Sequence, residues 1–215
     1  MADIQHPSSE LLQLLAKALN VAPDASGNVR PFDVVEQAMT TLGIMVLLPS
    51  NAKHVDIGEW HRKLRRGDHV IVRSANSNEV FHHAIYIGPY NPPGQDKEHE
   101  YVVDMYGEPQ DGKHGASLRL RKMSQFLKTK GYPELAALEY SNDTPAARDC
   151  TAGLALLAHA ELRDVKGLYN LLDCNCDHFA TWCRTMRWVS TDMAAATTLA
   201  SETLPLLPSV RSHKF

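Results

Sequence analysis

The residues best suited to chemistry lie between Tyr169 and Arg184, in the stretch YNLLDCNCDHFATWCR. Apolar side chains follow Cys176 at helical spacing, which predicts a helix with one buried face: Phe179, Trp182, Cys183 and Met186. Asn175 is a residue type that commonly caps a helix start. A first-turn cysteine lies among backbone N–H groups at the positive end of the helix, where the thiolate is favoured. The sequence therefore predicts a nucleophile at Cys176, with Asn175 and Asp177 at the helix start supporting an oxyanion.

Two other interpretations of this cysteine remain open. A single cysteine on an apolar helix is often a small buried hydrophobe. Cys174, Cys176 and His178 could also be read as metal ligands. That spacing lacks the usual gap of two to four residues between cysteines, and no matching second half occurs elsewhere in the chain. We therefore expect neither a metal site nor a cofactor.

A base and a carboxylate for the thiol are expected on two predicted strands, residues 80–87 and 101–105. Side chains alternate between the faces of a strand, so an antiparallel pair in the right register brings His82 and Asp104 together. If the helix packs on that surface, Cys176 points at His82. The hypothesis is a thiol-dependent acyl transfer site with Cys176 as nucleophile, His82 as general base and Asp104 orienting the base.

His83 competes with His82 for the role of base, since it lies next to it on the other face of the strand. The small Ala84 shares a face with His82 and leaves room for a packed helix, which favours His82. A purely structural histidine and a surface carboxylate are the alternatives for His82 and Asp104.

Two short motifs resemble the signature sequences of the LRAT-like family, which includes lecithin:retinol acyltransferase and the HRAS-like suppressor phospholipase/acyltransferases. The first is HHAIYIG, residues 82–88, and the second is NCDHF, residues 175–179, where the family has Asn-Cys-Glu-His-Phe. Gly67-Asp68 resembles the family's opening Gly-Asp, so the resemblance covers roughly residues 64–187. It implies a permuted papain-like fold of the NlpC type, with Cys176 as nucleophile and His82 as base.

Two departures from the family pattern concern the substrate. The family's acyltransferases usually carry a second histidine where this chain has Asp104. We also expect no counterpart of their C-terminal membrane anchor. The expected function is acyl transfer or hydrolysis on a lipid acyl ester through an acyl-thioester. The alternatives are a cysteine peptidase or amidase acting on a peptide or isopeptide bond, and a non-catalytic interaction protein on the same scaffold.

The elements that must position these residues follow from apolar periodicity and turn signals. Consecutive strands without long intervening helices predict an α+β fold, in which an antiparallel meander packs against the cysteine-bearing helix. Three regions are expected: an N-terminal helical extension at 1–60, a catalytic domain at 61–190 and a C-terminal tail at 191–215. The expected strands are 69–72, 80–87, 101–105, 117–120 and 136–140; the expected helices are 9–19, 31–42, 145–162, one from 124 and one from 176.

The overall composition and charge of the chain indicate which classes of binding partner to expect. A net charge of −3 in 215 residues gives no global field for nucleic acid. No apolar run reaches the roughly 18 residues that a spanning helix needs. The first residues are neither basic nor apolar, so we expect no secretory signal there. Three of the four cysteines crowd one helix start, which fits reduced thiols in a cytoplasmic protein. We expect a lipid or acylated substrate, peripheral contact at most with membranes, and a protein partner, if any, bound through residues 1–60.

Overall fold

The computed structural model describes the central part of the chain and isolated N-terminal positions. The predicted helices at 9–19 and 31–42 lie largely outside the described residues, and the tail at 191–215 lies wholly outside them. The described residues are 13, 16–17, 20–23, 27, 29, 37, 48–74, 81–106, 116–128, 133–165 and 174–190.

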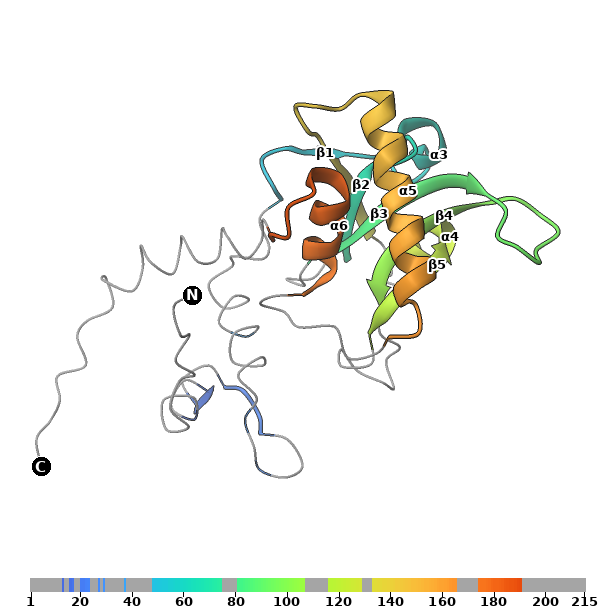
Figure 1. The fold of residues 1–215 in the computed structure, drawn as a ribbon. Helices are drawn as coiled ribbons and strands as arrows, with labels where there is room; N and C mark the ends of the chain where they lie inside the picture. The colour runs from blue at the N-terminus through green and yellow to red at the C-terminus, as the bar shows by residue number, and fades with distance from the viewer. Residues whose placement is uncertain are drawn as a thin grey trace, which may run out of the picture.

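A six-stranded antiparallel sheet forms the centre of the fold (Figure 1), in the order β1-β6-β2-β3-β4-β5. Strands β2 to β5 form the predicted meander. β6 does not extend it but returns to pair with β2, and β1 pairs with β6 at the edge. The strands are β1 Ala52–His54, β2 His69–Ser74, β3 His82–Tyr90, β4 His99–Tyr106, β5 Ser117–Lys122 and β6 Pro133–Leu138.

Four helices accompany the sheet in the described part of the chain: α3 Trp60–Lys63, α4 Met123–Lys128, α5 Pro145–Leu162 and α6 Cys176–Thr185. α5 has the predicted bounds because Thr144 caps it, accepting a hydrogen bond from the Ala147 backbone N–H at 3.1 Å, and Pro145 suits the first turn. Among the described residues, no helix has the length and apolar character needed to span a membrane.

The turn before β2 depends on Gly67, which has a φ of +84°. Its backbone N–H donates to the Tyr86 carbonyl oxygen at 2.7 Å, and the next residue, Asp68, accepts from the Tyr86 N–H at 2.9 Å. A Cβ at Gly67 would overlap the backbone carbonyl of Arg148 in α5. A glycine is therefore required where β2, β3 and α5 meet.

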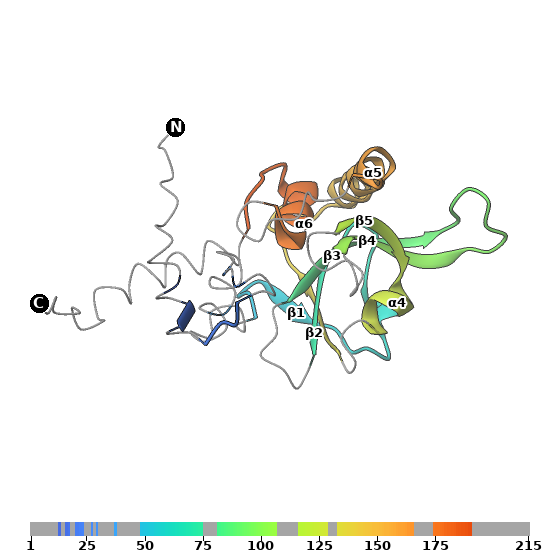
Figure 2. The same cartoon turned by 90° about the horizontal axis from the view of Figure 1, so that it is seen from below.

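The sheet is covered on both faces (Figure 2), with α5 and α6 on one side and α4 on the other. Ile85 and Ile87 of β3 pack with α5 and α6 in one apolar cluster. Ala84 and Tyr86, which alternate with them, pack with Phe126 of α4 in a second cluster. Neighbouring residues of β3 therefore belong to different compartments, and we name the two sides the α6 face and the α4 face.

Candidate active site

Cys176 is the first residue of α6, as the sequence predicts. Asn175 caps this helix, because its side chain accepts a hydrogen bond from the backbone N–H of His178 at 3.0 Å. The His178 ring completes the capping box, since its Nδ1 accepts from the backbone N–H of Asn175 at 3.4 Å. Cys176 is 7% exposed and packs in the apolar cluster of the α6 face. The thiol thus lies at a well-capped helix start, largely screened from solvent.

All four cysteines are free thiols. Cys150 is exposed on α5, and Cys174 is partly buried just before α6. Cys183 is buried, and burial raises the pKa of its thiol. That shift leaves Cys183 protonated and unreactive at neutral pH.

His82 and Asp104 meet on neighbouring strands. Nε2 of His82 donates a hydrogen bond to Oδ2 of Asp104 at 2.7 Å. Arg121 of β5 also binds Asp104: its Nε donates to Oδ1 at 3.1 Å and its terminal nitrogen contacts Oδ2. The His82 ring lies 5.5 Å from the Phe126 ring, centroid to centroid. This histidine and carboxylate therefore form a buried network on the α4 face.

Burial and hydrogen bonding shift the pKa values of His82 and Asp104 in opposite directions. Burial lowers the pKa of the His82 imidazole, although the hydrogen bond to Asp104 opposes the shift. Burial alone would raise the pKa of the Asp104 carboxyl, but the hydrogen bond from His82 and the charge of Arg121 hold that pKa below its usual range. The stable state near neutral pH is a neutral imidazole held between an aromatic ring and a carboxylate.

The structure places α6 and the His82 ring on opposite faces of β3. α6 packs on Ile85, on the α6 face, whereas His82 shares the α4 face with Ala84 and Phe126. The expectation that the cysteine helix covers the His82 surface therefore differs from the structure. The physical reason is that both faces of β3 are apolar and both are buried, so strand alternation alone could not decide which face the helix covers.

His83 is the histidine of β3 that lies on the α6 face. Its Nδ1 lies 3.3 Å from Oδ1 of Asp177, the residue after Cys176, and 2.9 Å from Nε2 of His69 in β2. The side chains of His69 and His83 are fully buried, and Asp177 is 2% exposed. Asp177 lies in the first turn of α6, and its carboxylate is turned toward an imidazole of the sheet.

Further polar groups hold this second cluster in place. Nδ1 of His69 lies 2.8 Å from the hydroxyl of Tyr140. Thr181 donates to Oδ1 of Asp177 at 3.0 Å, and Ser190 donates to Oδ2 at 2.7 Å. Burial lowers the pKa of His69 to about 3, and the neighbouring His83 adds to the shift. Burial also raises the pKa of Tyr140. Sequence reasoning missed His69, although the strand predicted at 69–72 begins with it.

An apolar cavity of about 360 Å³ lies beside the start of α6. Cys174 and Trp188 line it, and Glu161 is the charged residue among its walls. Its other main walls come from the sheet, α5 and α6: Met105, Leu118, Leu154, Leu157, Phe179 and Trp182. Cys176 packs in the same apolar cluster as Met105, Leu118 and Phe179.

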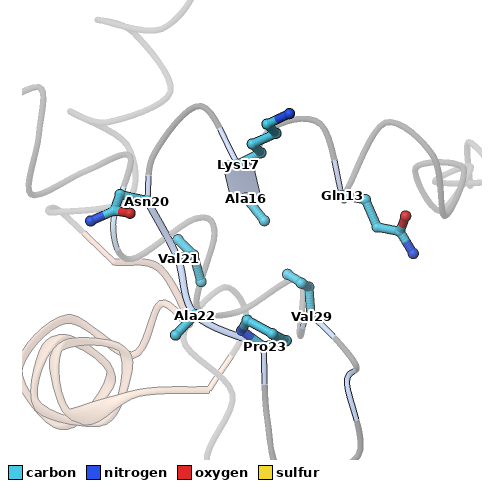
Figure 3. Close-up of a pocket in the computed structure, with 8 residues that line it drawn as sticks. All are labelled: Gln13, Ala16, Lys17, Asn20, Val21, Ala22, Pro23 and Val29. Atoms are coloured by element: carbon cyan, nitrogen blue, oxygen red, sulfur yellow. The ribbon is translucent and has the colours of Figure 1, made fainter.

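A second cavity, about 500 Å³ in volume, lies in the N-terminal region (Figure 3). Eight residues between Gln13 and Val29 line it. Among the described residues that line it, none carries a thiol, an imidazole or a carboxylate.

Comparison with known proteins agrees with the family resemblance of the two motifs at residues 82–88 and 175–179. The family model described as Lecithin retinol acyltransferase matches residues 62–189. This range contains the six-stranded sheet apart from β1, together with α4, α5 and α6. No curated protein and no solved structure gives a match. The matched range is more than half of the 215 residues, and the chain therefore belongs to the lecithin retinol acyltransferase family.

Proposed function

We propose that this protein is a thiol-dependent acyltransferase or hydrolase that acts on lipid acyl esters, with Cys176 as its nucleophile. Family membership suggests acyltransferase or hydrolase chemistry. The observation that carries the proposal is the apolar cavity beside the capped start of the cysteine helix. A cavity of this size lies within the range of small-molecule binding sites, and its apolar walls suit a hydrocarbon chain.

The mouth of the cavity supports a lipid rather than a polar substrate. Leu157, Leu162 and Trp188 line the cavity and remain 59%, 40% and 47% exposed. Exposed apolar side chains around a hollow are typical of sites that meet lipid or another apolar partner. We propose that an acyl chain enters here from a micelle or membrane surface and brings its ester carbonyl toward the start of α6.

We propose His83 rather than His82 as the base, on the strength of its position in the fold. His83 lies on the α6 face, and its Nδ1 is 3.3 Å from the carboxylate of Asp177, which directly follows Cys176. Cys176 packs in the apolar cluster of the same α6 face. Asp177 and His69 both contact Nδ1, so the proposal assigns the proton transfer to Nε2. His82 and Asp104 then take a structural role on the α4 face.

The proposed reaction has two halves. His83 takes the proton of the Cys176 thiol, and the thiolate attacks the ester carbonyl carbon while first-turn N–H groups of α6 stabilise the oxyanion. The C–O bond breaks, the leaving alcohol takes the proton from His83, and the acyl group remains as a thioester on Cys176. Water, an alcohol or an amine then attacks the thioester carbonyl and gives its proton to His83. The C–S bond breaks, the acyl group leaves on the acceptor, and His83 returns the proton to the Cys176 sulfur.

The test uses the purified full-length chain and phosphatidylcholine labelled in its acyl chain, in mixed micelles. We expect release of labelled fatty acid and an acyl adduct on Cys176, detected by mass spectrometry and removed by hydroxylamine. Cys176→Ala should abolish both signals. Cys174→Ala is the matched control, since it removes a neighbouring thiol from the cavity wall, and it should retain the adduct. Turnover that survives Cys176→Ala would refute the proposal.

Separate substitutions of the adjacent residues His82 and His83 test which of them is the general base. His83→Gln should lower turnover by about 100-fold or more, the usual effect of losing a general base. His82→Gln should retain turnover within about fivefold in molecules that fold, because its ring faces α4. The reverse outcome would assign the base to His82, as the sequence motif predicts, and would require α6 to cover the other face in the active state.

A second candidate is a non-catalytic interaction protein on the same scaffold. The observation that favours it is the burial of Cys176 together with the opposite orientation of His82. Iodoacetamide labelling at neutral pH distinguishes the two. A thiol activated for catalysis should label faster at Cys176 than at the exposed Cys150, whereas an inert Cys176 with no lipid adduct would favour the interaction protein.

A further inference from the structure

Two imidazoles and one carboxylate converge inside the protein from three separate elements. His69 comes from β2, His83 from β3 and Asp177 from the first turn of α6. One nitrogen from each histidine and one oxygen of Asp177 all lie within 4.8 Å of one another. Asp177 lies far from the two histidines in the sequence, and the fold brings all three together at the start of α6.

Two of the three separations are close to those between ligands around a small tetrahedral cation. Nε2 of His69 and Nδ1 of His83 are 2.9 Å apart, and Nδ1 of His83 is 3.3 Å from Oδ1 of Asp177. Ligands bound to zinc at about 2.0–2.1 Å in a tetrahedron are separated from one another by about 3.3 Å. Two nitrogens and one carboxylate oxygen also form a donor set that zinc accepts in proteins.

Hydrogen bonding within the trio does not fully explain the arrangement. The same atom, Nδ1 of His83, faces both Nε2 of His69 and the carboxylate of Asp177. A neutral imidazole nitrogen carries at most one proton, so Nδ1 cannot donate a full hydrogen bond to both partners. A cation bound at the centre would satisfy all three atoms at once.

The groups behind the trio match the outer shell that metal ligands usually have. His69 turns its other ring nitrogen to the hydroxyl of Tyr140, at 2.8 Å. Thr181 and Ser190 bind the oxygens of Asp177 at 3.0 Å and 2.7 Å. Such partners fix the tautomer of a ligating histidine and the orientation of a ligating carboxylate.

From this juxtaposition we infer that His69, His83 and Asp177 form a binding site for a zinc-type divalent transition metal. The site differs from the Cys174, Cys176 and His178 set considered from the sequence. It ties β2 and β3 to the start of α6, so the bound metal stabilises the packing of the cysteine helix on the sheet.

The proposed metal site does not depend on catalysis, but both proposals assign a role to His83. A metal on Nδ1 places the ring proton on Nε2, and that nitrogen then cannot accept a proton from Cys176. This consequence rests on the proposed function and predicts inhibition by the bound metal. The test of the metal site therefore uses binding and stability as its readouts, so its result does not depend on whether the chain is an enzyme.

The experiment titrates the chelator-treated full-length protein with Co²⁺ and Zn²⁺. We expect one ion per chain, a visible Co²⁺ absorption of tetrahedral intensity without a thiolate charge-transfer band, and displacement of Co²⁺ by Zn²⁺. Asp177→Asn and His69→Gln should each weaken binding by about 10- to 100-fold. Asp104→Asn is the matched control, a buried carboxylate on the opposite face, and should change affinity by less than about twofold since it lies outside the ligand shell.

Three results would overturn the inference: no stoichiometric binding, affinity unchanged in both ligand variants, or a thiolate charge-transfer band that assigns the metal to the cysteines. If a ligand variant does not fold, the melting temperature of the unaltered protein supplies the readout. It should rise with Zn²⁺ and not with Mg²⁺, which prefers oxygen ligands. Absence of the rise with excess Zn²⁺ would also refute the site.

Discussion

Removing the carboxylate of Asp104 should destabilise the protein more than most single substitutions. Asp104 is fully buried and binds both His82 and Arg121. Breaking a buried ion pair by deleting one partner costs about 3–5 kcal/mol, because the remaining charge stays desolvated. The side chains of Arg121 and His82 retain 13% and 14% exposure, which allows some rehydration. We therefore expect Asp104→Ala to lower the free energy of unfolding by about 3 kcal/mol, the lower end of this range.

Urea denaturation of a double-mutant cycle measures the pairing itself. Arg121→Met keeps apolar contact with Tyr106, over whose ring the guanidinium lies at 3.9 Å, and removes the charge. The coupling between Asp104→Ala and Arg121→Met should be about 1–3 kcal/mol, the range for directly paired groups. A cost below about 1 kcal/mol for Asp104→Ala, or a coupling below about 0.5 kcal/mol, would refute the reasoning.

The same carboxylate predicts the direction of a pH effect. The pKa of Asp104 is lowered in the folded protein, because its pairing with His82 and Arg121 outweighs burial. The unfolded chain therefore binds its proton at higher pH than the folded chain does. The stabilisation that the ionised Asp104 gives the folded protein is complete above about pH 4. It is lost as the pH falls through the pKa of Asp104 in the folded state. The stability difference between the unaltered protein and Asp104→Asn should thus be larger at neutral pH than in acid, as successive urea titrations would measure.

Three further predictions concern the scaffold of the site. Asn175→Ala removes the cap of α6 and should cost about 1 kcal/mol in urea denaturation, whereas Asn175→Asp should retain most of the stability. Gly67→Ala combines a positive φ with an overlap against the Arg148 carbonyl, so a loss of more than about 3 kcal/mol is expected; a fully stable variant would contradict the geometry of this turn. Phe126→Ala, at a fully buried position of α4, should lower stability by about 3–5 kcal/mol in thermal unfolding, and a loss under about 1 kcal/mol would mean that the α4 face is loosely packed.

Local sequence signals predicted much of the fold because each has a short-range physical cause. The Thr144-Pro145 start predicts α5, and the cap residue before Cys176 predicts the beginning of α6. Two-residue alternation together with antiparallel pairing predicts that His82 and Asp104 are neighbours, and the structure places them 2.7 Å apart. These features depend on backbone hydrogen bonding over a few residues, which local sequence reports directly.

The layering of helices on the sheet could not be predicted in the same way. Ala84 and Ile85 point to opposite faces of β3, yet both are fully buried, so neither face is marked as the one that faces solvent. Which helix covers which face depends on the path of the connecting chain and on the fit of distant apolar surfaces. The meeting of His69 with His83 and Asp177 follows from that same long-range choice.

The positions of the tryptophans give the molecule a built-in optical probe. The chain has three, and Trp182 and Trp188 both line the apolar cavity, with ring centroids 6.3 Å apart. Trp60 packs against the cluster on the α4 face, across the sheet. Occupation of the hollow by a hydrocarbon chain would change the surroundings of two indoles and leave the third as an internal reference. Intrinsic fluorescence can therefore follow ligand entry without any label.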